Sequence, residues 1–135
     1  MTKNLSLALY TKFNEQTGGV YNDFHVKLVG KLFKEVAPQD ATYPRATYHI
    51  LTNTHEWSFK EDYSNVLVQF NIYTKDSSSS RAEDIAKACI DLYRWCQLTI
   101  TDHDFVYMRD ENSVLFQDSD GIWVYSIQFR VLYDN

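Results

Sequence analysis

The segments VLVQFNIY (residues 66–73) and SRAEDIAKACIDLYRWC (residues 80–96) decide the fold. In the first, apolar and polar residues alternate, which predicts a strand with one buried face. In the second, Ser80 and Glu83 match a capping box, and apolar residues recur behind them at the helical period. Glu83 and Lys87 lie at i,i+4 on the polar side of this helix. The apolar stripe consists of Ala82, Ile85, Ala86, Cys89, Leu92, Tyr93 and Cys96.

A long hairpin is predicted downstream of this helix. Asp120-Gly121, within DSDG at residues 118–121, is a turn signal, and apolar residues then alternate from Trp123 to Tyr133. A preceding strand begins around Phe105 and resumes at residues 114–117 after a polar interruption. One face of this sheet is therefore apolar and must be covered.

The N-terminal third is less regular. Residues 5–13 have helical spacing, with Asn4 available as an N-cap and Gly18-Gly19 as a stop. Residues 20–29 fit either a strand or a helical turn, and residues 31–36 alternate as in a strand. The residues before Pro38 and Pro44 are biased away from helix, which predicts an extended, exposed loop between the two prolines.

Residues 46–51 alternate as a short strand, and the polar residues 52–65 fit either a loose loop or the outer arms of a long hairpin. The whole pattern predicts an α+β fold: a mostly antiparallel sheet of about four to five strands with two helices packed on one face. At 135 residues, the chain fits a single domain, residues 1–135.

Composition excludes several classes of function. The formal net charge is −5, and no basic cluster is present, which argues against a protein that grips nucleic-acid phosphates. No signal peptide is expected, and no apolar run approaches the ~20 residues of a membrane span. Cys89 and Cys96 are about 10 Å apart along the expected helix, too far to bridge, and are expected to be reduced core thiols.

The sequence contains no convincing catalytic or metal-binding pattern. Asp102-His103-Asp104 is the one place where a base and carboxylates crowd together, but adjacent strand residues point to opposite faces, so the start of a strand is favoured. His25, His49, His55 and His103 lack the spacing of a zinc site. The DSDG segment lacks the later ligands of a calcium loop. We therefore expect no catalytic, cofactor-binding or metal-binding residue.

The ten Tyr, eight Phe and three Trp are many for one small core, so some rings are expected on contact surfaces. Trp57, Phe59 and Tyr63 lie in an acidic segment and are candidates for docking anchors. The alternative that they fold back onto their own sheet is equally open. Base stacking by the row from Trp123 to Tyr133 is disfavoured, because that row is expected to face the core.

The order of these signals resembles the tail-completion, or tail-terminator, proteins of long-tailed bacteriophages and prophages. The resemblance spans about residues 5–133, and its motifs are loosely spaced pattern positions. They are Leu9-Tyr10, Gly30-Lys-Leu-Phe33, Ala37-Pro-Gln39, Tyr43-Pro44, the strands at 46–51 and 66–73, Ser80, Ile85-Ala-Lys-Ala88, the turn at 118–121 and Gln128-Phe-Arg-Val131. Residues 20–29 are bulkier and residues 53–65 longer than this family pattern.

The resemblance implies a non-enzymatic protein that forms a ring, typically a hexamer, at the head-proximal end of the tail. Such a ring ends polymerisation of the tail tube protein, joins a head-completion or connector protein, and lets DNA pass without specific binding. It implies assembly in the bacterial host cytoplasm, with no cofactor and no membrane. The interface residues expected are Pro38, Gln39, Asp40, Tyr43, Trp57, Phe59 and Tyr63.

Two alternatives stay open. One is a free-standing α+β domain that binds or converts a small molecule, which would need a concave pocket with convergent polar groups. The other is a different phage protein, either a head-completion or a minor tail protein.

Overall fold

The computed structural model describes residues 2–58 and 61–135, which form helices and strands in the order α-β-β-α-β-β-β-α-β-β. The helices are α1 (Thr2–Phe13), α2 (Asp23–Leu28) and α3 (Ser80–Tyr93). The strands are β1 (Gln16–Thr17), β2 (Val20–Tyr21), β3 (Leu32–Lys34), β4 (Arg45–Ser58), β5 (Glu61–Thr74), β6 (Asp104–Gln117) and β7 (Trp123–Asp134).

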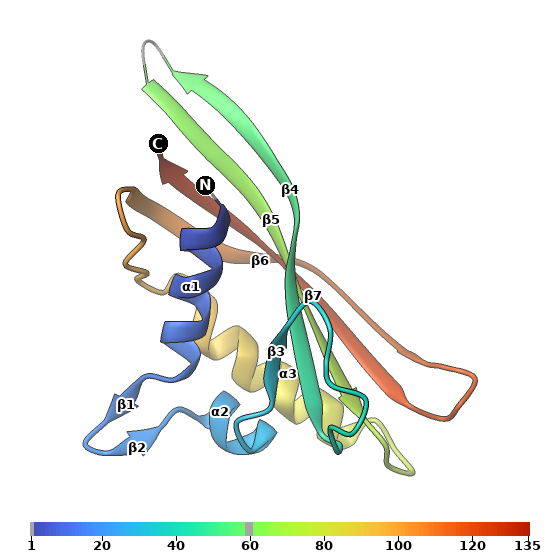
Figure 1. The fold of residues 1–135 in the computed structure, drawn as a ribbon. Helices are drawn as coiled ribbons and strands as arrows, with labels where there is room; N and C mark the ends of the chain where they lie inside the picture. The colour runs from blue at the N-terminus through green and yellow to red at the C-terminus, as the bar shows by residue number, and fades with distance from the viewer. Residues whose placement is uncertain (1, 59–60) are drawn as a thin grey trace.

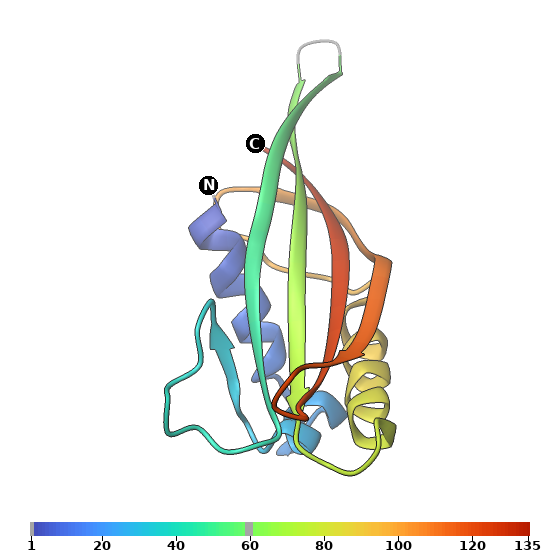
Figure 2. The same cartoon turned by 90° about the vertical axis from the view of Figure 1, so that its right-hand side faces the viewer.

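The described strands form a five-stranded sheet in the order β3-β4-β5-β7-β6, and β1 and β2 form a separate small ribbon. Every pairing in the main sheet is antiparallel except that of the short β3 with β4. All three helices lie on one face of this sheet, and the other face is uncovered (Figure 1). Figure 2 looks onto that uncovered face and shows β4 and β6 toward opposite sides of the sheet. The α+β prediction is confirmed, with one more helix than expected.

The core lies between the helices and the inner face of the sheet. Phe70 on β5 is fully buried among other rings, 4.8 Å from Tyr93 and 5.5 Å from Phe129 between centroids. The Tyr93 hydroxyl donates to the backbone oxygen of Leu9 at 2.8 Å, which ties α3 to α1. The alternating apolar residues of β7 are buried from Ile127 onward, as predicted. The rings of Phe129 and Tyr133 are therefore not available for stacking on bases, whereas Trp123 and Tyr125 are half-buried.

Several helix ends differ from expectation. Helix α1 already begins at Thr2, so Asn4 is inside it, and its side-chain amide donates to the oxygen of Thr101 at 3.2 Å. The predicted capping box is wrong: the N-cap of α3 is Ser79, which makes no side-chain cap bond. Helix α3 ends at Tyr93, before Trp95, which has a positive φ of 53°.

The ambiguous segments are now assigned. Residues 52–58 and 61–65 are the outer arms of the long β4–β5 hairpin, so the strand expected at 46–51 is longer than predicted. The register shifts between Ile50 and Thr52, which leaves Leu51 as a bulge. Residues 20–29 hold β2 and then α2, whose N-cap Asn22 accepts from the backbone N–H of His25 at 2.9 Å. Within the described part of the chain, no helix has both the length and the apolar character to cross a bilayer.

Candidate interaction surface

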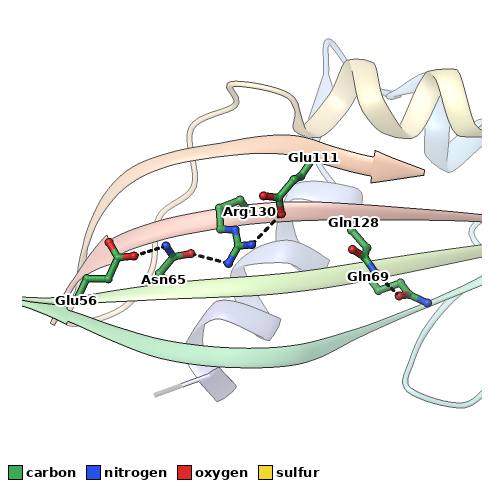
Figure 3. Close-up of polar contacts among 6 residues, drawn as sticks. All are labelled: Glu56, Asn65, Gln69, Glu111, Gln128 and Arg130. Carbon is green, nitrogen blue, oxygen red and sulfur yellow. Dashed lines mark hydrogen bonds and ion pairs between the residues drawn. The ribbon is translucent and has the colours of Figure 1, made fainter. Parts of the chain in front are cut away.

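The uncovered face of the sheet carries a ladder of polar side chains that bond to one another (Figure 3). Arg130 on β7 donates to Asn65 on β5 at 3.1 Å and to Glu111 on β6 at 2.9 Å. The amide of Asn65 in turn donates to Glu56 on β4 at 2.7 Å. The chain of contacts thus crosses four strands, pairs the Arg130 guanidinium with the Glu111 carboxylate, and reaches the Glu56 carboxylate through the Asn65 amide.

A second group of amides lies further along the same face. Gln128 donates to Gln69 at 3.2 Å, Gln69 donates to Asn71 at 2.8 Å, and Ser126 donates to Asn71 at 2.6 Å. Because these groups satisfy one another, this part of the face needs no apolar cover and can face water.

The β4–β5 hairpin carries two of the predicted docking residues, Trp57 and Tyr63, of which Tyr63 is half-buried. Trp57 is 71 % exposed, so it does not fold back onto its own sheet. His55 Nδ1 lies 2.8 Å from an Asp62 carboxylate oxygen. The Tyr63 hydroxyl donates to Glu61, and that hydrogen bond raises the pKa of Tyr63. Phe59 lies outside the described residues.

The proline loop, residues 38–44, lies at the other end of β4. Pro38, Gln39 and Asp40 are exposed, as predicted for this loop. Tyr43 is half-buried, with the Arg45 guanidinium 4.5 Å from its ring centroid. Since the loop and the hairpin tip flank opposite ends of one strand, the structure does not bring the two predicted interface regions together.

A surface at the β6 edge was missed from the sequence. Trp95 is 64 % exposed, and its ring centroid lies 5.9 Å from that of Tyr107. Beside it, Arg94 donates twice to Asp110, at 2.6 and 2.8 Å, and this hydrogen bonding lowers the pKa of Asp110. Tryptophan, tyrosine and arginine are the residues enriched at binding hot spots. The available signal was the Arg94-Trp95 pair, which follows the last buried position of the helix.

A hollow of about 510 Å³ lies beside the point where β3 ends on β4. It is lined by Ser6 of α1, by Lys34 and Glu35 at the end of β3, and by His49 and Ile50 of β4. This is the concave feature that the small-molecule alternative would need.

The residues considered for catalysis or metal binding do not come together in one site. Strand β6 begins at Asp104, His103 packs on the Tyr133 ring at 5.0 Å, and Asp102 lies in a turn with a φ of 66°. Within residues 2–58 and 61–135, no three His, Cys, Asp or Glu side chains are grouped to hold a metal ion. The Asp118 carboxylate accepts from the backbone N–H groups of Asp120 and Ile122, both at 2.9 Å, so the DSDG segment is a hairpin turn.

Both cysteines are unbridged, as predicted from their spacing. Burial raises the pKa of the Cys89 thiol, and it raises that of Cys96 to about 11. At neutral pH both side chains are therefore thiols, and the reactive thiolate form is suppressed.

No protein-family model matches this chain, and no curated protein matches its sequence. Its fold does match a solved structure, a chain of "Virion of native gene transfer agent (GTA) particle". The TM-score is 0.77, and the match covers 97 % of this chain and 95 % of that chain at 12 % identity. The two chains therefore share one fold over nearly their whole lengths.

Proposed function

We propose that the protein is a structural component of a phage-like virion, and within that class a tail terminator. In this role about six copies form a ring that ends growth of the tail tube and joins it to the head connector protein. The fold shared with a chain of a gene transfer agent virion supports the virion role. The sequence resemblance to tail-completion proteins supports the finer role.

The observation that carries the ring is the placement of two different exposed anchors. Trp57 lies on β4 and Trp95 lies beside β6, and these strands lie toward opposite sides of one sheet (Figure 2). A ring of identical subunits is built from head-to-tail contacts, each of which joins two different patches. A subunit with unlike sticky patches on opposite sides suits this geometry.

The polar face of the sheet suits a channel wall. Arg130 is paired with Glu111, which offsets its positive charge, and the amides of the ladder are uncharged, so the ladder offers DNA phosphates little net positive charge. The formal net charge of −5 acts in the same direction. DNA would pass such a wall without specific binding.

The contacts with other virion proteins are assigned to the two ends of β4. The loop with Pro38, Gln39, Asp40 and Tyr43 would contact one of these proteins, and the hairpin at Tyr63 the other, while Trp57 serves the contact between subunits. The two proteins are the tail tube protein and the head connector protein. No catalytic step or cofactor is part of this function, and the ring would assemble in the host cytoplasm and remain in the virion.

The test is a stop codon early in the gene, in cells that produce the particles. We expect unjoined heads and tails of irregular length by electron microscopy, and restoration by the gene supplied in trans. Gold-labelled antibody against the chain should mark the head-proximal end of the tail in wild-type particles. Normal particles without the protein would reject this function and favour a role for the hollow at Lys34, Glu35 and His49.

A further inference from the structure

We propose that neighbouring copies join by pairing two open sheet edges. Residues 52–58 of β4 in one copy pair, antiparallel, with residues 112–117 of β6 in the next copy. This inference rests on the proposed ring and names its subunit contact.

The outer edge of β4 is paired with β3 near the start of the strand and has no strand partner in its second half. Strand β3 pairs with β4 at Ala46–Tyr48, and the backbone N–H of Glu35 donates to the oxygen of Tyr48 at 2.8 Å. Beyond Tyr48, no described strand pairs with this edge. The hollow beside His49 and Ile50 lies where the cover by β3 ends. An added strand would therefore continue the sheet where β3 leaves it.

The β6 edge has the same division. The backbone N–H of Trp95 donates to the oxygen of Met108 at 2.7 Å, which occupies the edge near the start of the strand. A bulge follows at Glu111, and from Asn112 to Gln117 the pairing with β7 is regular. No described strand covers the outer side of this run. Val114 and Phe116 there are 52 % and 47 % exposed.

The two open runs carry little of the usual protection of an edge strand, with Glu56 as the one carboxylate. Natural sheets discourage edge pairing with charged side chains, above all lysine, and with proline or bulges. Residues 52–58 (TNTHEWS) and 112–117 (NSVLFQ) contain no lysine and no proline, and the bulges lie just before each run. The two runs are also nearly equal in length, so each can satisfy the backbone groups of the other.

The direction of the two edge strands, and the sheet face on which their side chains lie, favour a second copy of the chain as the pairing partner. Along the order β4-β5-β7-β6 each pairing is antiparallel, so β4 and β6 run in opposite directions. Copies arranged head to tail would therefore continue the antiparallel alternation without a break. Thr54, opposite Asn65, and Val114, opposite Ser126, both lie on the uncovered face, so the faces also match.

Charge separates this contact from a two-fold β4–β4 contact. The β6 run is uncharged, whereas the β4 run carries Glu56. Pairing β4 with β4 would bring two such carboxylates together, and like charges across a sheet are unfavourable. Pairing β4 with β6 avoids that repulsion. A two-fold β6–β6 contact is the competing arrangement that the experiment must separate.

The experiment is cysteine cross-linking in the full chain. Thr54→Cys and Val114→Cys are combined in a Cys96→Ser background, and a short bis-maleimide is added over a range of protein concentrations. We expect a ladder of linked chains up to the ring size, and no ladder with either cysteine alone. Lys87→Cys with Val114→Cys is the matched control, because Lys87 is exposed on α3.

Three outcomes would overturn the pairing. The first is a dimer linked by Val114→Cys alone. The second is a ring of the double-cysteine variant that the bis-maleimide does not cross-link. The third is a monomer at every protein concentration. All three leave the terminator function to its own test on particles lacking the protein. Conversely, cross-linked rings together with normal particles lacking the protein would reject the function and keep the pairing.

A pair of blocking variants tests the same contact without cross-linking. Thr54→Lys and Val114→Lys should each weaken association roughly tenfold or more, while circular dichroism stays unchanged because both sites are exposed. An equal mixture of the two should form two-chain species and nothing larger. The intact β6 edge of Thr54→Lys can pair with the intact β4 edge of Val114→Lys, and the blocked edges then stop further growth. Full-size rings from either variant at wild-type concentrations would refute the contact.

Discussion

Replacing Trp57 with alanine separates assembly from folding. The side chain is 71 % exposed on the outer arm of the hairpin, where it lies opposite Asp62. A tryptophan buries roughly 200 Å² when fully covered, so about 140 Å² is available to a partner. At about 25 cal/mol per Å², covering that area contributes about 3.5 kcal/mol per contact. This corresponds to a loss of affinity of roughly 300-fold on truncation.

The same substitution should barely affect folding. The part of the ring already buried is about 60 Å², which limits the loss of unfolding free energy to about 1.5 kcal/mol, and exposed sites usually change by less than 0.5 kcal/mol. The assays are urea unfolding and the mass in solution, with Val20→Ala as control, because Val20 is 65 % exposed on the separate β1–β2 ribbon. If the Trp57→Ala variant associated as tightly as the wild-type protein, the role of Trp57 as an anchor would be refuted.

Three further predictions concern the fold. Phe70→Ala should lower the unfolding free energy by about 3–5 kcal/mol in urea, because the ring is fully buried among other aromatics; a loss under 1 kcal/mol would contradict this packing. Gly30→Ala should cost about 1–2 kcal/mol, since φ is +74° and a Cβ would lie 3.3 Å from His25; unchanged stability would count against the left-handed turn. The hydrogen bonds from Arg94 lower the pKa of Asp110, so their stabilisation is present at neutral pH and is lost as the pH falls through that lowered pKa. In Asp110→Asn, the unfolding free energy should therefore fall less steeply as the pH is lowered. The same fall as in the wild-type protein would contradict this contribution of Asp110.

The strands and the main helix could be predicted because local periodicity and burial agree there. Val66, Phe70 and Ile72 face the core at period two, and Ile85 and Cys89 do so at helical spacing. The buried residues of β7, from Ile127 to Tyr133, could be predicted for the same reason. Burial on one face is the physical cause of both periodicities, so the sequence carries them directly.

Other features depend on long-range pairing, which leaves little local trace. The outer arms of the β4–β5 hairpin are polar on both faces, so Asn53 and His55 gave no alternation to indicate a strand. The capping box at Ser80 failed because Ser79 occupies the N-cap, a choice between neighbouring serines that sequence pattern does not resolve.

The interface candidates were found only in part. Trp57 could be proposed from its acidic surroundings, and it is exposed. Trp95 was missed despite the Arg94-Trp95 pair, because its exposure follows from the end of α3 at Tyr93 and from its backbone bond to Met108 on the following strand. Likewise the two open edges depend on the strand order β3-β4-β5-β7-β6, which no local signal encodes.

The tail-terminator proposal is tested most directly by the mass of the purified protein across concentration, with electron microscopy of any large species. A tail terminator should form a ring of about six chains with an open centre, and the same ring should be seated at the head-proximal end of the tail in particles. A chain that stays monomeric in solution and leaves no density at that end of the tail would contradict it.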